Sequence, residues 1–338
     1  MASRNTISDI ARQLGVSKTL VSFVLNGKSK EMRISDEMTS RVLELARSLN
    51  YKPNYLAKSL RTGKSHTIGL IVADISNPFF AHLARYIEIE ASKRKYKIVF
   101  SSSDENRTKF AAQLEILKDG HVDGFILTPP IGSEKELLLL QEQKVPFVLV
   151  DRIFKNVEAH SVIIDNYHAA YYATMRLISN GRKNIALLNV NNELITMQAR
   201  AKGYMDAIGA SGLKAEPALI KHLKFSHEKK LVMKAILEII QNKADAVLFT
   251  TNKLGVLGIE CIQELELRIP ENLSIISFDD TDLYKISSTS ISAIQQPLEN
   301  MSKEAVRILV SMIETPAAIK DFEKIELKAE FVLRKSCM

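Results

Sequence analysis

The sequence predicts an α/β protein in which an N-terminal all-α head precedes a two-lobed body of doubly wound parallel sheets. Three observations predict this fold class. The whole net positive charge lies in the first 66 residues. Short amphipathic helical segments fill the same stretch. From residue 67 onward, short apolar runs alternate with longer amphipathic segments, as they do in βαβ units.

The overall composition is that of an ordinary globular protein. Apolar residues make up 46% of the 338 positions and charged residues 25%, which excludes wholesale disorder and fibrous repeats. The two cysteines, Cys261 and Cys337, have no paired spacing, so neither a disulfide framework nor a zinc site is expected. The first residues contain no apolar run of signal-peptide length, and no stretch approaches about 18 apolar residues. We therefore expect a cytoplasmic protein with no membrane partner.

The net positive charge is confined to the head. Residues 1–66 hold 12 Lys and Arg against five Asp and Glu, a net charge of +7, whereas residues 67–338 hold 34 of each sign. This asymmetry indicates a polyanion-binding head on a neutral body. A solvated basic tail would show the same excess of charge, but it would lack an apolar period.

Two of the three head helices are defined by their start signals and their apolar stripes. The first is predicted over 7–14, with a capping-box-like start formed by Thr6 and Asp9. The third is predicted over about 36–49, after an N-cap at Ser35. Both segments have apolar residues at helical spacing, so each helix can bury one face against a neighbour.

The second head helix is predicted to begin after Ser17 and to end at Asn26, just before a glycine. Two short helices joined by a Gly-containing turn, with a third completing the core, are typical of a helix-turn-helix. The second helix of that motif enters the major groove of DNA with its N-terminal residues at base edges. A plain three-helix structural domain is the alternative, but the charge of the head favours DNA binding. The side chains expected to point outward are those of Lys18, Thr19, Ser22 and Phe23.

A further short helix is predicted in the segment that joins the head to the body. Pro53 suits the first position of a helix and Gly63 its end. The helix between them has fewer than three turns, so it is too short to be stable alone in water and should order only against a partner. An ordinary linker helix is the alternative interpretation.

The body contains two series of apolar runs separated by helical segments. The predicted strands are 67–73, 97–101, 123–128, 146–150 and 161–165 in the first series and 184–190, 244–250 and 273–278 in the second. Two βαβ series predict two doubly wound parallel sheets, and therefore two lobes that face each other across a cleft. In such sheets, ligands bind beyond the carboxyl ends of the strands.

Polar and aromatic side chains follow several of these strands. They are Asp74, Ser76, Phe79 and Phe80 after the first strand, Asp151 and Arg152 after 146–150, Asn252 after 244–250, and Asp279 and Asp280 after 273–278. Carboxylates, an arginine, an amide and flat aromatic rings suit a small, neutral, hydroxyl-rich ligand. Alternatively, Asn252, Asp279 or Asp280 caps the helix that follows, and Phe80 belongs to the core.

Two long segments of the chain resemble a known family. These are ISDIARQLGVSKTLVSFVLNG and YKPNYLAKSLRTGKSHTIGLIVADISNPFFAHL, which resemble the LacI/GalR family of bacterial transcription regulators. The resemblance continues through DGFIL, VPFVLVDR, VIIDN, ARAKGY, PENLSIISFDD and AIQQP, so it covers nearly the whole chain. Each fragment alone is a weak signal, whereas the combination is highly specific.

The resemblance implies the DNA contacts and the division into domains. In that family the joining segment is a hinge helix that folds on operator DNA, and its leucine, matching Leu60 here, wedges into the minor groove. The domains are then a helix-turn-helix domain at 1–50, a hinge helix and linker at 51–66, and a body at 67–338. The residues expected to contact DNA are Thr6, Ser17, Lys18, Thr19, Ser22, Phe23, Asn26, Ala57, Lys58 and Leu60.

The resemblance also implies a periplasmic-binding-protein-like body whose two lobes hold a small effector. The first lobe is expected at about 67–165 and 292–330, and the second at about 166–291. A sugar or sugar derivative is the expected effector. The residues expected to bind it are Phe79, Phe80, Asp151, Arg152, Arg200, Phe225, Asn252, Asp279 and Gln296, with Arg200 taken from an Arg-x-x-Gly pattern.

The chain departs from the family pattern at four positions. Leu20 and Phe23 replace polar residues in the second head helix, and Phe23 could contact a thymine methyl group or pack on the head itself. Tyr55 is bulkier than the small residue usual at its position. Lys253 stands where an acid is usual, and it could favour a carboxylated or phosphorylated ligand or point to solvent.

Sequence motifs of enzymes are missing from the chain. It contains no nucleophile elbow, no phosphate loop and no dinucleotide fingerprint, and its seven histidines show no metal spacing beyond the isolated pair His222 and His227. We therefore expect no catalytic activity and no cofactor. The predicted function is that of a transcription regulator, a repressor that binds palindromic operator DNA as a homodimer under effector control. A sugar-binding or sugar-active protein with an incidental DNA head is the alternative.

Overall fold

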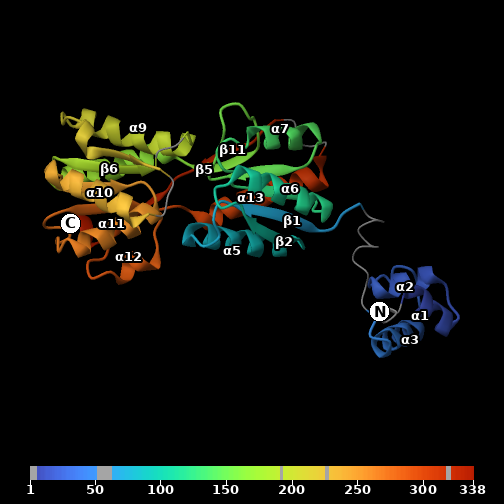
Figure 1. Ribbon diagram of the computed structural model, residues 1–338. Coiled ribbons are helices and arrows are strands. Elements are labelled where there is room, and N and C mark those ends of the chain that lie inside the picture. Colours follow the sequence, from blue (N-terminus) through green and yellow to red (C-terminus); the bar gives the residue numbers. More distant parts are fainter. Residues whose placement is uncertain (1–5, 52–62, 191–192, 225–227, 317–320) are drawn as a thin grey trace. The chain divides into compact units, whose positions relative to one another are not determined.

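The computed structural model describes residues 6–51, 63–190, 193–224, 228–316 and 321–338 (Figure 1). The chain forms two compact units, Met1–Ser65 and His66–Met338. We call the first unit the head and the second the body, and each is described by itself.

The described part of the head consists of three helices around a small apolar core. They are α1 (Ile7–Leu14), α2 (Lys18–Leu25) and α3 (Asp36–Ser48). Ser17 and Ser35 act as N-caps of α2 and α3, because each hydroxyl accepts a hydrogen bond from a backbone N–H in the first turn. The side chains buried between the helices are those of Ile10, Ala11, Val21, Val24, Val42 and Ala46. The predicted helix-turn-helix arrangement is therefore present.

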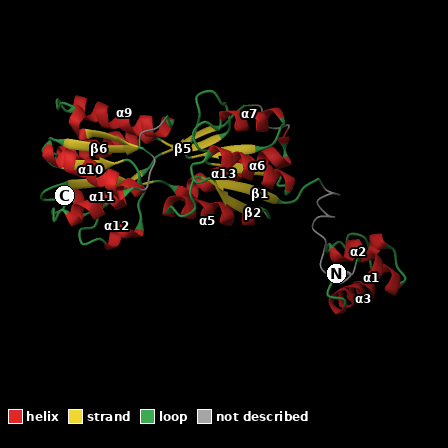
Figure 2. Ribbon diagram, viewed as in Figure 1, coloured by secondary structure: helices red, strands yellow, loops and turns green. Residues whose placement is uncertain are grey.

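The body contains two six-stranded sheets, each covered by helices on both faces (Figure 2). The first sheet has the strand order β11-β5-β4-β3-β1-β2, and all its neighbouring strands are parallel. Its strands are β1 (Thr67–Val72), β2 (Lys97–Ser102), β3 (Gly124–Leu127), β4 (Phe147–Val150), β5 (Ser161–Ile164) and β11 (Lys324–Leu327). We call this sheet and its helices the first lobe.

Alternating side chains of the first sheet face two different pairs of helices. Ile68, Leu70 and Ile126 pack in one cluster with α5 (Pro78–Lys93) and α13 (Leu298–Glu314). The residues between them, such as Ile71 and Phe125, pack in another cluster with α6 and α7. These helices are α6 (Arg107–Asp119) and α7 (Glu134–Glu142). Both faces of the sheet are covered, as parallel sheets require.

The second sheet has the strand order β12-β10-β9-β8-β6-β7, parallel except for the β10–β12 pair. Its strands are β6 (Ile185–Val190), β7 (Ile220–Leu223), β8 (Ala246–Phe249), β9 (Ser274–Phe278), β10 (Ser292–Gln295) and β12 (Glu330–Val332). Its helices are α8 (Asn166–Ser179), α9 (Ile195–Ala210), α10 (Lys229–Gln241), α11 (Asn252–Glu264) and α12 (Asp282–Ile286). Short 3₁₀ turns lie at Pro217–Leu219 and Lys335–Cys337. We call this sheet and its helices the second lobe.

One expectation about the lobes is wrong. The segment 292–330 was expected to belong wholly to the first lobe, but β10 pairs in parallel with β9 in the second sheet. Pairing there buries Ala293 and Ile294 almost completely, and this burial decides the side on which the strand lies. The chain then enters the first lobe through α13 and β11 and returns to the second lobe at β12.

The α13 helix has 17 residues, and it packs against α5 and the first sheet. Among the helices in the described ranges, none combines the length and the apolar composition needed to cross a membrane.

Candidate functional site

The outer surface of α2 carries most of the residues expected to contact DNA. Ser17, Lys18, Thr19 and Asn26 are exposed, and Ser22 is partly exposed. Two of these side chains also serve the helix itself. The hydroxyl of Ser17 accepts a hydrogen bond from the N–H of Leu20 at 3.1 Å, and the amide of Asn26 donates to the carbonyl of Ser22 at 2.7 Å. Both keep their remaining hydrogen-bonding capacity for a partner.

The two departures from the family pattern in α2 have different surroundings. Leu20 packs against the apolar core of the head. Phe23 is partly exposed, and it is not among the described apolar side chains that pack on that core. This placement favours an outward-facing role for Phe23.

Thr6 lies exposed at the start of α1, beside Asp9. Its backbone N–H and its hydroxyl both donate to the Asp9 carboxylate, at 2.9 and 2.7 Å. These hydrogen bonds from Thr6 hold the pKa of Asp9 below its ordinary value. The other predicted DNA contacts, Ala57, Lys58 and Leu60, lie outside the described residues.

In the body, a small cavity lies at the carboxyl ends of strands from both sheets. Its volume is about 50 Å³. Its lining includes seven of the nine residues predicted to bind effector, namely Phe79, Phe80, Asp151, Arg152, Arg200, Asn252 and Asp279. Of the other two, Gln296 lies in a neighbouring hollow of about 400 Å³ that shares Phe79 and Asp279, and Phe225 lies outside the described residues.

Two carboxyl groups, a partly buried one in the first lobe and a buried one in the second, occupy equivalent places. Asp151 follows β4 and Asp279 follows β9, and both have left-handed backbone conformations, with φ of 67° and 64°. Burial raises the pKa of Asp151 to about 6, against the effect of the nearby cation of Arg152. Burial likewise raises the pKa of Asp279, whose carboxylate accepts a hydrogen bond from the Gln296 amide at 2.6 Å. The carbonyl oxygen of that amide is buried with no hydrogen-bond partner among the described residues.

Arg200 brings a buried cation close to these acids. Its side chain is only 1% exposed, and its guanidinium lies 4.0 Å from the ring centre of Phe278. The guanidinium donates to the side-chain oxygen of Asn166 at 2.7 Å and to the carbonyl of Thr250. Burial lowers its pKa, and the charge of Asp279 opposes that effect. Arg200 is therefore held from both α8 and the end of β8.

The Arg-x-x-Gly pattern has a structural reason in α9. A Cβ atom on Gly203 would overlap the carbonyl oxygen of Tyr167 in α8. The glycine lets the two helices approach closely, and Asn166, in the first turn of α8, can then reach Arg200. The glycine of the motif therefore allows the helix contact that positions its arginine in the cavity.

Arg152, in the cavity, and Asp280, in the neighbouring hollow, each have an ion-pair partner. Arg152 donates two hydrogen bonds to the Glu105 carboxylate, at 2.7 and 2.5 Å, and a third to the Pro129 carbonyl at 3.2 Å. Asp280 forms a two-pronged ion pair with Arg334, at 2.8 and 2.7 Å. Arg152 lines the cavity with a neutralised charge, and Asp280 ties the C-terminal segment to the second lobe.

Several lining residues were not predicted from the sequence. They are Asn77, Leu194, Thr196, Met197 and Thr251. Thr196 and Met197 precede Arg200 by about one helical turn, so helical spacing could have indicated them. Thr251, not Asn252, is the N-cap of α11, and the side-chain amide of Asn252 exchanges hydrogen bonds with that of Asn77, at 3.2 and 2.6 Å. Phe80 both lines the cavity and belongs to the apolar core.

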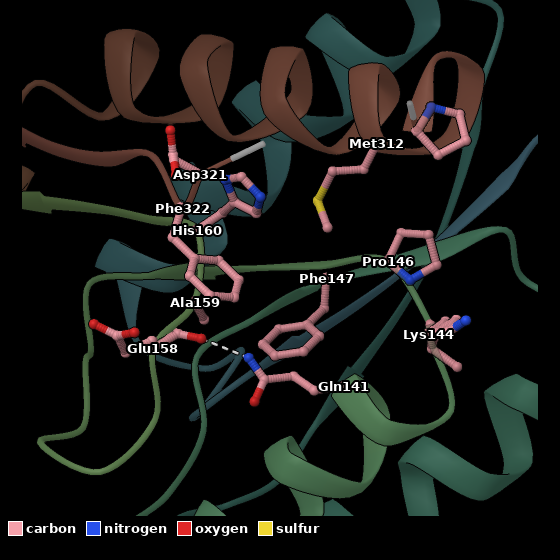
Figure 3. A pocket seen from close by; sticks show the side chains of 12 residues that line it. Gln141, Lys144, Pro146, Phe147, Glu158, Ala159, His160, Met312, Asp321 and Phe322 are labelled. Atoms are coloured by element: carbon pink, nitrogen blue, oxygen red, sulfur yellow. Dashed lines mark hydrogen bonds between the residues drawn. The ribbon is translucent and has the colours of Figure 1, made fainter. Parts of the chain in front are cut away.

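A larger hollow of about 620 Å³ lies elsewhere on the first lobe (Figure 3). Phe147 and His160, from the amino ends of β4 and β5, face Met312 of α13 across it. None of the residues predicted from the sequence to bind effector or DNA lines this hollow.

The helix-turn-helix and the two-lobed body with its cleft define a DNA-binding regulator with a ligand-binding domain. Residues 6–54 match the family of bacterial regulatory proteins called lacI, and residues 65–304 match the periplasmic binding proteins and sugar binding domain of the LacI family. The chain therefore belongs to the LacI family of bacterial transcription regulators.

Similar proteins extend over nearly the whole chain. Catabolite control protein A of Priestia megaterium is 31% identical over 96% of this chain and 98% of its own length. The lac repressor dimer bound to operator and the anti-inducer ONPF superposes with a TM-score of 0.86 over 99% of this chain and 100% of its own, at 20% identity. A LacI family regulator from Enterococcus faecium with bound ribose has a TM-score of 0.70 at 27% identity, over 80% of this chain and 98% of its own.

Proposed function

We propose that the protein is a repressor that binds a palindromic operator as a homodimer and responds to a small hydroxyl-rich effector held between its lobes. The observation that carries this proposal is the union, in one chain, of a basic helix-turn-helix with a two-lobed cavity lined by buried carboxyl groups. The proposal includes a head at 1–50, a hinge at 51–66 and a body at 67–338, and a cytoplasmic location beside the chromosome.

The exposed surface of α2 supports the operator contacts. Lys18 and Thr19, in its first turn, are exposed, and base edges are read from the N-terminal part of such a helix. Phe23 offers an apolar contact to a thymine methyl group. The proposed contacts of Ala57, Lys58 and Leu60 rest on the family resemblance. With them, the proposed DNA-contacting set is Thr6, Ser17, Lys18, Thr19, Ser22, Phe23, Asn26, Ala57, Lys58 and Leu60.

The cavity supports a neutral ligand that donates hydrogen bonds. Asp151 forms an ion pair with Arg152 at 3.8 Å, beyond hydrogen-bond distance, and the side-chain oxygen of Gln296 has no hydrogen-bond partner among the described residues. The cations around them are already engaged, since Arg152 pairs with Glu105 and Arg200 faces the two acids. Hydroxyl groups satisfy such acceptors without adding charge. A sugar is the simplest ligand of this kind, and the related regulator from Enterococcus faecium holds ribose.

An exposed apolar edge supports the homodimer. β2 is an edge strand of the first sheet, and Val99 and Phe100 in it are 45% and 61% exposed. On α6, which contacts β2, Ile116 is 61% exposed. A long edge strand with exposed apolar side chains normally has a partner. A second copy of this chain would cover it and would bring two heads to two half-sites.

The family consists of regulators, and the proposal assigns no catalytic step. Within the described ranges, no group of three or more His, Cys, Asp or Glu side chains is arranged to hold a metal ion. Turnover of any bound sugar by the purified chain would contradict this part of the proposal.

Selection from a random duplex library by the full chain tests the DNA-binding function. The expected product is a palindrome whose two halves are related by the two-fold axis of a dimer. Enrichment of no sequence, with retention of all duplexes equally, would show that the head binds only as a polycation.

A thermal-shift screen of the full chain tests the ligand class. Neutral sugars, sugar phosphates, sugar acids and nucleobases are compared at equal concentration, and a neutral sugar should raise the melting temperature. Stabilisation by the phosphorylated or carboxylated compounds alone would contradict the acceptor-rich account of the cavity.

A further inference from the structure

The larger hollow of about 620 Å³ lies at the opposite end of the first sheet from the small cavity (Figure 3). Phe147 begins β4 and His160 directly precedes β5, whereas Asp151, at the other end of β4, lines the small cavity. Among the described residues, none lines both. Small-molecule sites typically have volumes of about 300 to 1,000 Å³. The larger hollow therefore has room for a ligand of its own.

The interior of the larger hollow is apolar, and its charged groups stand at exposed positions. Seven of the twelve described residues that line it are apolar, among them Phe147 and Met312. Phe322, another of them, is 47% exposed although its ring borders this apolar interior. The charged lining residues, all exposed, are Lys144, Glu158 and Asp321. Burying an ion in such an interior costs far more than burying a neutral group, so the lining favours a neutral ligand.

His160 supplies one hydrogen-bond donor to this interior. Its Nδ1 accepts a hydrogen bond from the backbone N–H of Glu323 at 3.0 Å, so the neutral imidazole carries its proton on Nε2. Burial lowers the pKa of His160, which keeps the ring neutral near pH 7. The residue is only 3% exposed, yet its Nε2 donates to none of the described residues. The Nε2–H group is therefore left for a ligand in the hollow that His160 lines.

Contacts among the lining residues hold the wall of the hollow in place. The side-chain amide of Gln141, near the end of α7, donates to the backbone carbonyl of Glu158 at 2.5 Å (Figure 3). The rings of His160 and Phe322 meet edge to face, with their centres 5.4 Å apart. Because these groups are already positioned, a ligand loses little affinity to the ordering of side chains.

We propose that the larger hollow is a second binding site, for a small neutral aromatic compound that carries a hydrogen-bond acceptor. The acceptor, such as a carbonyl oxygen, binds the Nε2–H of His160. The aromatic ring packs against Phe147 and Phe322 and contacts the sulfur of Met312. This inference goes beyond the proposed function, because it depends on neither operator binding nor effector binding.

Fluorine NMR of the full chain with two matched probes tests the site. The first probe, para-fluoroacetophenone, has an aromatic ring and one carbonyl oxygen. The second, para-fluoroethylbenzene, has the same carbon skeleton and lacks the oxygen. Broadening of each probe signal on addition of protein gives its dissociation constant, which should lie below about 1 mM for both. Absence of binding by both probes at this concentration would overturn the proposed site.

The variant His160→Asn tests the hydrogen bond. The shorter side chain keeps an acceptor for the Glu323 N–H and removes the donor at Nε2. It should weaken the binding of para-fluoroacetophenone by about three- to tenfold, the range expected for one hydrogen bond. The binding of para-fluoroethylbenzene should change by less than about twofold. An equal loss of affinity for the two probes would overturn the role of the Nε2–H group.

The variant Met312→Glu tests the place of binding, with Met205→Glu as its matched control. Met312 is a partly exposed residue of α13 that lines the hollow, whereas Met205 is 42% exposed on α9 and does not line it. Met312→Glu should weaken both probes at least about tenfold, because an apolar ring would displace water from the new carboxylate. The control variant should bind both probes as the wild type does.

Circular dichroism shows whether each variant is folded. Equal affinities of the Met312 and Met205 variants for the probes would overturn the proposal, since the probes would then bind elsewhere on the chain. No sugar and no DNA are present, so the result is independent of the proposed function.

Discussion

The pKa of Asp151 depends on its surroundings in the cavity. It is placed by the end of β4 and a left-handed backbone, and burial raises its pKa from 3.8 to about 6. A carboxyl group in this state accepts hydrogen bonds well only when it is ionised, so ligand binding and proton release are linked. Because the pKa is raised on folding, Asp151 lowers the free energy of unfolding near neutral pH.

The pH dependence of stability tests this cost. Below the unfolded pKa both states are protonated; as pH rises from about 4 to 6 the unfolded state loses its proton first, so stability falls. The wild type should therefore lose roughly 2 kcal/mol of unfolding free energy over this range relative to Asp151→Asn. Chemical denaturation at several pH values measures the difference. Parallel pH profiles for the two proteins would contradict the raised pKa.

The two unusual apolar residues of α2 should differ in what they affect. Phe23→Ala should weaken binding to the selected operator about five- to tenfold while leaving the melting temperature of the head unchanged. Leu20→Ala, the matched comparison, should lower the melting temperature because Leu20 packs on the core. Fluorescence anisotropy and calorimetry measure the two effects. A destabilising Phe23 variant would show that the ring packs on the head.

At the residue scale, the sequence predicts that residues following different strands line one cavity, and the structure brings them together there. Asp151, Asn252 and Asp279 could be assigned to one site because the carboxyl ends of parallel strands converge. The partner of Lys253 could not, because Asp74 lies 179 positions away, in the other lobe. The place of Asn77 in the cavity was not predicted either, because its partner Asn252 lies in the other lobe. The sequence shows only that Asn77, just before Pro78, suits the N-cap of a helix.

At the element scale, the close contact of α8 and α9 positions the buried cation of the cavity. Gly203 makes this contact possible, and Arg200 lies one turn before it on the same helix. The predicted strands occur within about two residues of their expected ends, because buried parallel strands are continuous apolar runs. β7, β10, β11 and β12 were not predicted. Three of these, β7, β11 and β12, are edge strands with mixed charged and apolar residues, and such short patterns carry little signal.

Two glycines of α9 provide a matched pair for a stability test. Gly203→Ala should lower the free energy of unfolding by about 2 kcal/mol or more, because the new methyl group meets the α8 backbone. Gly209→Ala meets no atom within 4 Å and should raise it by up to about 1 kcal/mol through helix propensity. Urea denaturation of both variants gives the comparison. Equal effects of the same sign would contradict the close helix contact.

At the scale of the whole molecule, the net charge lies on the head and the exposed apolar edge lies on the body. The head holds the net charge of +7, and the body is neutral overall. The body presents an apolar edge at β2, where a second copy would pack. The division into a head and a two-lobed body could be predicted from charge and periodicity, whereas the place of β10 and the return of β12 to the second lobe depend on pairing between strands.

The dimer edge has a direct test. Phe100→Glu places a charge on the exposed edge strand and should lower the dimer association constant at least tenfold, or about 1.4 kcal/mol. Leu138→Glu, at an exposed position of α7, serves as the control. Sedimentation velocity distinguishes monomers from dimers. Unchanged dimerisation of the Phe100 variant would remove β2 from the interface.

The most direct test of the central claim compares the full chain with a chain lacking residues 1–62. Both are titrated against the selected operator at several salt concentrations, and both are heated with the identified sugar. The full chain should bind operator with an affinity that falls steeply with salt, because the head neutralises phosphates. The truncated chain should lose operator binding and keep the stabilisation by sugar. Operator binding retained by the truncated chain would contradict the division of DNA recognition and ligand sensing between head and body.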